Sequence, residues 1–420
     1  MKKFKLRSKE WFDNPNDPGL TALYLERYLN YGLKREDLQS GKPIIGIAQS
    51  GSDLSPCNRH FQALSKTIKD GIREAGGVPM EFPTHPIQET GKRPTAALDR
   101  NLSYLSLVEV LYGYPIDGVI LTTGCDKTTP AALMAAATVN IPSIVLSGGP
   151  MLDGNYKGKK AGSGTIIWEA RKLHAKGEID YDEFMDMAAA SAPSIGHCNT
   201  MGTASSMNSI AEALGMSLPG GAIIPAPYKE RTDISFKTGK RIVEMVFENL
   251  TPSKIMTKEA FENAVYVASA IGASSNCPPH LTAIARHMGI DFNLDQWEKL
   301  GHRIPLLANC QPAGEHLMEG FFKAGGIPAI MKELIKDKKL NIKALTVTGK
   351  TIEENLNMKI DVNRDVIKSY ENPLSHNAGF IVMKSNFFSS AVMKTSVISS
   401  EFRERYLSNK DSLNIFEVKA

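Results

Sequence analysis

The apolar run Pro43-Ile44-Ile45-Gly46-Ile47-Ala48 decides the fold class, because a helical pattern and then a second apolar run succeed it along the chain. A short, continuous apolar run bounded by polar residues is typical of a strand that is buried on both faces. Residues 58–75 have the periodicity of an amphipathic helix, and Gly76-Gly77 supply its stop. Residues 78–82 predict a second strand, and the order strand, helix, strand predicts a parallel βαβ unit.

The same alternation continues to about residue 150. We expect helices over residues 95–112 and 130–139, strands over residues 117–122 and 144–146, and a short helix near residues 20–31. The sequence therefore predicts an α/β fold with a parallel sheet and helical regions. Ligands of such sheets bind beyond the carboxyl ends of the strands. Three polar loops are predicted there, at residues 49–57, 122–129 and 147–150.

The second half of the chain has a different pattern. Residues 180–330 are mostly helical in periodicity, with helices expected over residues 179–189, 257–272 and 280–289. Short strands are expected over residues 344–350 and 379–384. We place a domain boundary near residue 375, at Asn372-Pro373. Residues 1–375 then form the α/β domain, and residues 376–420 form the incomplete beginning of a β-rich C-terminal domain.

Composition excludes several classes of protein. The 420 residues are 42% hydrophobic and 22% charged, with a net charge of +4 and no block of five like charges, which argues against disorder and nucleic-acid binding. No apolar stretch approaches the roughly 18 residues of a membrane span, and no secretory signal follows the basic N-terminus. Five scattered cysteines without a CxxC pair favour a reducing compartment, so we expect a cytoplasmic protein.

Three cysteines lie in polar loops rich in Gly, Pro and Asn, namely Cys57, Cys125 and Cys198. A free cysteine is most often a small buried hydrophobe. Thiolates collected from distant loops instead suit a soft metal or an iron–sulfur cluster better than a structural zinc, whose ligands come in close-spaced pairs. P-loop, HExxH and GxSxG motifs are absent, and Gly162-Ser163-Gly164 lacks the third glycine of a dinucleotide site.

Two further polar positions have ordinary alternatives. Asp126 and Lys127 follow Cys125, and a solvated pair at the start of a helix explains them as well as a functional role does. Glu89, in a loop after a strand, would by itself be a surface carboxylate.

Around these residues the sequence resembles the dihydroxy-acid dehydratase / phosphogluconate dehydratase family, and within it the pentonate dehydratases that act on L-arabinonate or D-xylonate. The blocks that carry the resemblance run through the whole chain. They are SDLSPCNRHF (52–61), QETGKRPTAALDRNL (88–102), TTGCDKTTP (122–130), LSGGPM (146–151), GHCNTMG (196–202), QPAGE (311–315) and MKTSVIS (393–399).

The resemblance implies two cofactors. Cys57, Cys125 and Cys198 match the ligands of an iron–sulfur cluster, with 2Fe-2S favoured and 4Fe-4S as the alternative. The matched Mg²⁺ ligands are Glu89, Asp126 and Lys127, the lysine after carboxylation, which gives a hard cation a further oxygen. Cys277 and Cys310 match no family role and are interpreted as packing thiols.

The implied reaction is loss of water from a 2,3-dihydroxy sugar acid to give a 2-keto-3-deoxy acid, in a homodimer or homotetramer. The family's catalytic base is a serine in a C-terminal domain, and residues 340–420 contain no loop that matches it. The resemblance thus implies a C-terminally truncated chain without an assignable base, whose activity is in doubt. Two alternatives stay open: a dihydroxy-acid dehydratase of branched-chain amino-acid synthesis, and a non-catalytic remnant.

Overall fold

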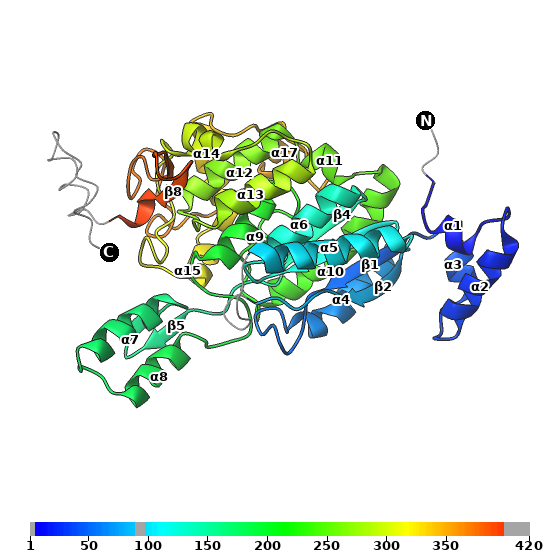
Figure 1. Cartoon of the computed structure of the whole chain (residues 1–420), viewed down its shortest axis with the longest axis horizontal. Helices are drawn as coiled ribbons and strands as arrows, with labels where there is room; N and C mark the ends of the chain where they lie inside the picture. The colour runs from blue at the N-terminus through cyan, green and yellow to red at the C-terminus, as the bar shows by residue number, and fades with distance from the viewer. Residues whose placement is uncertain (1–4, 89–96, 399–420) are drawn as a thin grey trace.

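A computed structural model describes residues 5–88 and 97–398 of the chain. Its centre is a four-stranded sheet in the order β2-β1-β3-β4, in which every pair is parallel (Figure 1). The strands are β1 (Ile44–Gln49), β2 (Val78–Pro83), β3 (Gly118–Thr123) and β4 (Ser143–Ser147). All residues of β1, β3 and β4 are buried, whereas β2 lies at an edge and is partly exposed. The predicted parallel α/β sheet is confirmed.

Helices cover the sheet. Helix α4 (Phe61–Glu74) packs against β1 and β2, and the long α10 (Lys229–Glu248) packs against α4, β3 and β4. These two helices approach each other very closely at Gly71. A Cβ there would lie 2.2 Å from the Phe236 carbonyl oxygen, so only glycine fits. Helix α6 (Thr128–Val139) packs against β3 and is joined by α5 (Ala97–Gly113). The sequence predicted α4, α5 and α6 close to their observed places, but it did not predict α10.

The strand order creates a switch point between β1 and β3. The chain passes from β1 to β2 on one side, and then crosses to place β3 on the other side of β1. Parallel sheets bind ligands at such reversals, outside the carboxyl ends of the strands. The loops that follow β1 and β3 carry Cys57 and Cys125, so the topology itself brings two of the predicted ligands to this edge.

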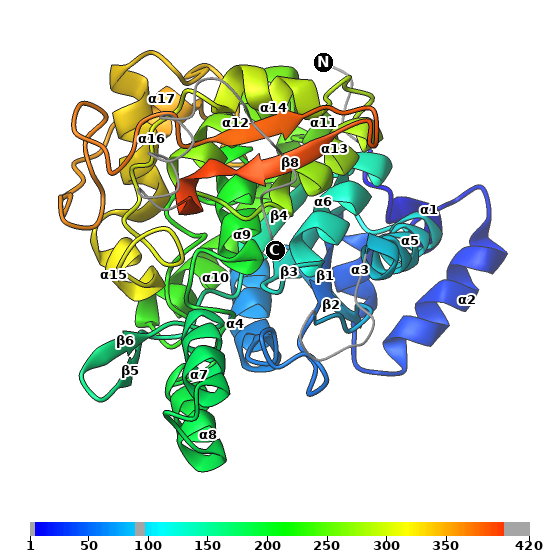
Figure 2. The same ribbon diagram turned by 60° about the vertical axis from the view of Figure 1, so that its left-hand side comes forward.

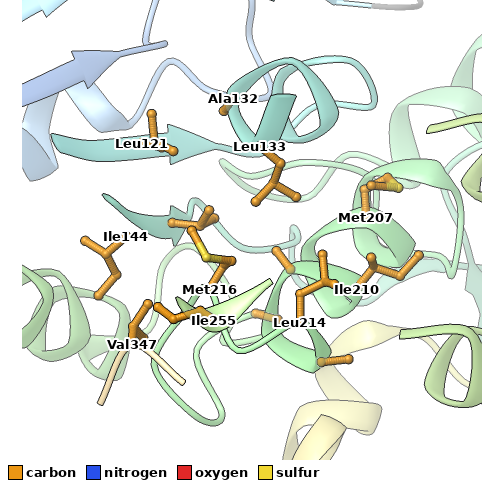
Figure 3. Packing of buried hydrophobic residues seen from close by; sticks show 14 of the residues in the cluster. Leu121, Ala132, Leu133, Ile144, Met207, Ile210, Leu214, Met216, Ile255 and Val347 are labelled. Atoms are coloured by element: carbon orange, nitrogen blue, oxygen red, sulfur yellow. The ribbon is translucent and has the colours of Figure 1, made fainter. Parts of the chain in front are cut away.

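A continuous hydrophobic core joins the sheet to the helical second half of the chain. Figure 3 shows part of this core: Leu133 of α6, Ile144 of β4, Ile210 of α9, Leu214 directly after α9, and Val347. The helices of this half are α9 (Thr203–Ala213), α11 (Pro252–Ile255), α12 (Lys258–Ala270), α13 (Cys277–His287), α14 (Leu294–Gly301), α15 (Met318–Lys323), α16 (Gly326–Lys336) and α17 (Ile352–Asn355).

Residues 154–190 project from this body as a separate lobe (Figure 2). It consists of the antiparallel hairpin β5 (Gly154–Tyr156) and β6 (Lys159–Ala161), followed by α7 (Thr165–Ala175) and α8 (Tyr181–Ala190). The lobe has a small core of its own, made of Ala161, Ile166, Ala170 and Met187. Of these elements the sequence pattern predicted only α8.

The two ends of the described chain add smaller elements. Helices α1 (Lys9–Phe12), α2 (Pro18–Leu29) and α3 (Arg35–Gln39) lie beyond the β2 side of the sheet (Figure 1). Near the other end, β7 (Phe380–Met383) and β8 (Ala391–Lys394) form an antiparallel hairpin, followed by the 3₁₀ turn η1 (Thr395–Val397). Within the described residues, no helix is long and apolar enough to cross a membrane.

The expected strand over residues 344–350 is wrong. This segment is a tight turn in which the Thr346 N–H donates to the Lys350 carbonyl at 3.0 Å. Gly349 adopts a φ of 76°, which a strand does not allow. Its β-branched residues, Thr346 and Thr348, bond to each other through their hydroxyls instead of continuing a ladder.

Candidate functional site

The thiols of Cys57 and Cys125 meet at the switch point. Cys57 lies in the loop after β1 and Cys125 in the loop after β3, and the two strands are neighbours in the sheet. A hydrogen bond between the two thiols, together with burial, raises the pKa of the Cys57 thiol well above its usual range. Cys125 is only 3% exposed. The sequence-predicted pair is thus brought into direct contact.

Cys198 joins them from a third loop. The neighbouring residue His197 pairs with the segment after β4: its N–H donates to the Gly149 carbonyl at 3.0 Å, and its carbonyl accepts from the Met151 N–H at 2.9 Å. Burial raises the pKa of the Cys198 thiol to about 11, and the nearby negative charges of Asp126 and Cys125 add to this effect. All three predicted thiols therefore lie within electrostatic reach of one another.

The structure describes two of the three predicted Mg²⁺ ligands. Asp126 is half-buried beside Cys125, and its charge raises the pKa of the thiols of Cys57 and Cys198. Lys127 is 5% exposed and immediately precedes the first turn of α6. Glu89 lies outside the described residues. The residue before it, Gln88, accepts a hydrogen bond from the Cys57 N–H at 3.4 Å.

Buried asparagines tie the cysteine loops together. Oδ1 of Asn58 accepts from the Cys125 N–H at 3.0 Å, which links the loop after β1 to the loop after β3. Asn208 of α9 donates to the Gly124 carbonyl at 3.2 Å and accepts from the Thr123 hydroxyl at 2.9 Å. Sequence reasoning did not identify Asn58 or Asn208 as supports of the site, because pairs of residues 67 or more positions apart leave no local signal.

A buried imidazole holds the segment that follows β4. The His60 ring lies 2.8 Å from the Gly148 carbonyl through Nε2, and burial lowers the pKa of His60 to about 4. A Cβ on Gly148 would lie 2.7 Å from that same nitrogen, so only glycine fits. His60 is therefore a neutral ring that anchors the segment after β4.

Cys277 was interpreted as a packing thiol, and the structure gives it charged neighbours. Burial raises the pKa of Cys277 to about 12, with Lys394 of β8 opposing the effect and Asp126 adding to it. Burial also lowers the pKa of Lys394 to about 8. Lys394 thus stands near the predicted site from the C-terminal hairpin, and sequence reasoning missed it as a site residue.

The three thiols fit an iron–sulfur cluster. The pKa values of Cys57 and Cys198 are raised, and a bound cationic iron centre would offset the cost of ionising these thiols. Among the residues the structure describes, no three His, Cys, Asp or Glu side chains surround a point suited to a single metal ion. Iron–sulfur clusters are several atoms across and are held by thiolates, which suits thiols that come from three separate loops.

Fold and site together define an α/β protein with a thiol-lined site at the switch point of a parallel sheet. Residues 42–355 match the family model described as dihydroxy-acid/6-phosphogluconate dehydratase, N-terminal. The chain belongs to this family, and it is accordingly a dehydratase, a carbon–oxygen lyase.

Named relatives match nearly the full chain. A D-xylonate dehydratase of Caulobacter vibrioides is 58% identical over 99% of this chain and 70% of the relative. An L-arabinonate dehydratase of Rhizobium leguminosarum bv. trifolii is 44% identical over 94% of this chain and 68% of the relative. A dihydroxy-acid dehydratase of Caldanaerobacter subterraneus is 39% identical over 89% of this chain and 68% of the relative.

Proposed function

We propose that this chain is an iron–sulfur, Mg²⁺-dependent hydro-lyase that converts a pentonate, such as D-xylonate or L-arabinonate, to its 2-keto-3-deoxy acid. The observation that carries the proposal is the contact between the thiols of Cys57 and Cys125 at the switch point, with Cys198 and Asp126 within electrostatic reach. The names of the relatives at 58% and 44% identity support a pentonate as the substrate.

Each proposed ligand has a defined part. Cys57, Cys125 and Cys198 hold the cluster, for which we favour 2Fe-2S over 4Fe-4S. Asp126 and Lys127, with Glu89, hold Mg²⁺. When bound, these groups supply Lewis acidity to the leaving C3 hydroxyl and to the carboxylate and C2 hydroxyl of the substrate.

The chain's own residues prepare this site. Burial keeps water from the thiol of Cys125, and the hydrogen bonds of Asn58 and Asn208 fix the backbone that carries it. Asp126 brings a negative charge that attracts a divalent cation beside the thiols. Preorganised loops of this kind hold ligands in place before the cofactor arrives.

Three further proposals come from the sequence. The antiparallel hairpin β7–β8 supports a β-rich domain from residue 376 onward, although Phe380 also packs edge-on against Trp297 at 5.2 Å. All five cysteines are free, which supports a reducing compartment such as the cytoplasm. We also propose a homodimer or homotetramer.

The test is a substrate comparison on protein reconstituted with iron, sulfide and Mg²⁺. D-xylonate, L-arabinonate and 2,3-dihydroxyisovalerate are supplied separately, and the 2-keto acid product is measured. We expect a brown protein that dehydrates a pentonate. Turnover of 2,3-dihydroxyisovalerate alone would favour the branched-chain enzyme. A brown protein that turns over none of the three would favour a non-catalytic cluster-binding protein.

A further inference from the structure

Asn58 is held rigidly between two of the three cysteine loops. It is 0% exposed, and its Oδ1 accepts from the Cys125 N–H at 3.0 Å. Its backbone N–H donates to the Ser55 carbonyl at 2.9 Å, and its carbonyl accepts from the Phe61 N–H at 3.0 Å. The amide orientation is fixed, because only the oxygen of the side chain can accept a hydrogen bond from an N–H group.

This orientation leaves the Nδ2 group of Asn58 as a buried donor with no acceptor among residues 5–88 and 97–398. The other buried asparagines each donate to a backbone carbonyl. These bonds are Asn199 to Leu152, Asn208 to Gly124 and Ala204, Asn263 to Asn341, and Asn309 to Asp365. Leaving a buried amide donor without a partner costs about 1–3 kcal/mol. An acceptor that arrives with a ligand would remove this cost.

Sulfur is the acceptor that the surroundings offer. Asn58 directly follows Cys57 and is bonded to the backbone of Cys125, so its amide lies where the two thiols meet. A neutral thiol accepts hydrogen bonds weakly, whereas an ionised thiolate or a cluster sulfide carries the negative charge that strengthens such bonds. The Nδ2 group would therefore form only a weak hydrogen bond to a neutral thiol and a stronger one to a sulfur of the bound cluster.

We propose that Asn58 is a positioning residue with two tasks: its Oδ1 locks the Cys125 loop to the Cys57 loop, and its Nδ2 donates to a sulfur of the bound cluster. This inference rests on the proposed function, since it needs the cluster at Cys57, Cys125 and Cys198. Hydrogen bonds to sulfur stabilise the more negative, reduced cluster and so raise its reduction potential.

The test compares Asn58→Asp with the wild-type protein, both reconstituted with iron and sulfide. The aspartate has nearly the same shape and keeps the acceptor for the Cys125 N–H, but it loses the donor. We expect a shift of the cluster to lower reduction potential and a loss of visible absorbance during storage. Asn263→Asp is the matched control, because it removes a buried amide donor that bonds to Asn341, and it should leave the potential unchanged.

A second measurement separates the hydrogen bond from the added charge. Pulsed EPR of the reduced cluster, in protein labelled with ¹⁵N only in asparagine side chains, should show a ¹⁵N coupling in the wild type. The coupling should vanish in Asn58→Asp and in the smaller variant Asn58→Ser. Wild-type protein without this coupling, or an unchanged potential in Asn58→Asp, would overturn the assignment of Nδ2.

The two proposals fail in different ways. If reconstituted wild-type protein binds no iron and sulfide, the proposed cluster is wrong and the role of Asn58 falls with it. If the wild type holds a cluster that Cys57→Ser, Cys125→Ser and Cys198→Ser lose, while Asn58→Asp matches the wild type in potential and ¹⁵N coupling, only the role of Asn58 is wrong.

Discussion

Glu212 and Arg231 bind alternate backbone groups of one buried loop. The Glu212 carboxylate accepts from the N–H groups of Gly220 at 2.7 Å and Ala222 at 2.9 Å, and Arg231 donates to the carbonyl of Gly221 between them at 3.0 Å. Arg231 also donates to the Ser147 carbonyl at 2.6 Å, at the end of β4. Two opposite charges buried in the core thus fix the loop behind the candidate site to the carboxyl end of the sheet.

The first prediction concerns Arg231→Met, which removes a fully buried guanidinium. The Glu212 carboxylate loses its compensating charge, and several loop carbonyls lose their donors. Removing one member of a buried charged set costs about 3–5 kcal/mol, and we expect a loss of this size in the free energy of unfolding measured with urea. Arg73→Met, at an exposed arginine of α4, should change it by less than about 0.5 kcal/mol. Equal stability of the two variants would contradict this account of the loop.

The second prediction is a pH dependence caused by His60. Burial lowers the pKa of the folded-state ring to about 4 from an ordinary value of 6.5, so the unfolded chain takes up the proton first on acidification. The stability contribution of the neutral ring is complete above pH 6.5 and is lost as the pH falls toward 4. The difference between the pKa values of the folded and unfolded states corresponds to about 3 kcal/mol in the free energy of unfolding.

The measurement is the unfolding free energy of cluster-free wild type and His60→Gln between pH 4 and pH 7.5. The glutamine keeps a donor for the Gly148 carbonyl but does not titrate, so the difference between the two proteins should grow in favour of His60→Gln as the pH falls. His174→Gln, at an exposed ring of α7, is the control and should follow the wild type. Parallel curves for wild type and His60→Gln would rule out the buried neutral ring.

The parallel sheet could be predicted from the sequence because its strands are continuous apolar runs separated by helices with clear periodicity. β1, β3 and β4 are buried along their whole length, so tertiary packing reinforces the local signal. The strand predicted at residues 344–350 is a turn, because the hydroxyls of its β-branched residues Thr346 and Thr348 bond to each other. The lobe of β5, β6 and α7 was missed, because a core as small as its own leaves only a weak pattern.

The candidate site, too, could be predicted from the sequence only in part. The sequence identified Cys57, Cys125 and Cys198 through their loops and a family resemblance. It did not find Asn58 or Asn208 as supports, since a hydrogen bond between positions 58 and 125 has no periodicity and no fixed spacing. The ligand assignment and the domain boundary near residue 375 remain predictions.

The third prediction tests the three thiols one at a time. Cys57→Ser, Cys125→Ser and Cys198→Ser should each lose nearly all the visible absorbance, iron and sulfide of the reconstituted protein, because a serine hydroxyl is a poor ligand for this soft site. Cys310→Ala is the control: its thiol is also buried, yet no other cysteine influences its pKa. If all three serine variants keep full colour, or if Cys310→Ala bleaches as they do, the ligand assignment is wrong.

The fourth prediction concerns the space beside Asn58. A Cβ on Gly124 would lie 2.3 Å from Oδ1 of Asn58, a distance that real contacts do not reach, so Gly124→Ala must push the asparagine side chain off the Cys125 N–H. We expect a loss of about 1–3 kcal/mol in unfolding free energy and weaker retention of iron. Gly113→Ala at the end of α5 meets nothing within 4 Å, and it should be neutral or stabilising by up to about 1 kcal/mol.

A double-mutant cycle makes this prediction specific to the pair. If the cost of Gly124→Ala arises from collision with the Asn58 side chain, the same substitution in an Asn58→Ala background finds the space already vacant and should cost much less. The two single losses would then sum to more than the loss in the double variant, which is the signature of residues in direct contact. Additive losses would mean that Gly124 is required for a reason other than the asparagine that links two of the cysteine loops.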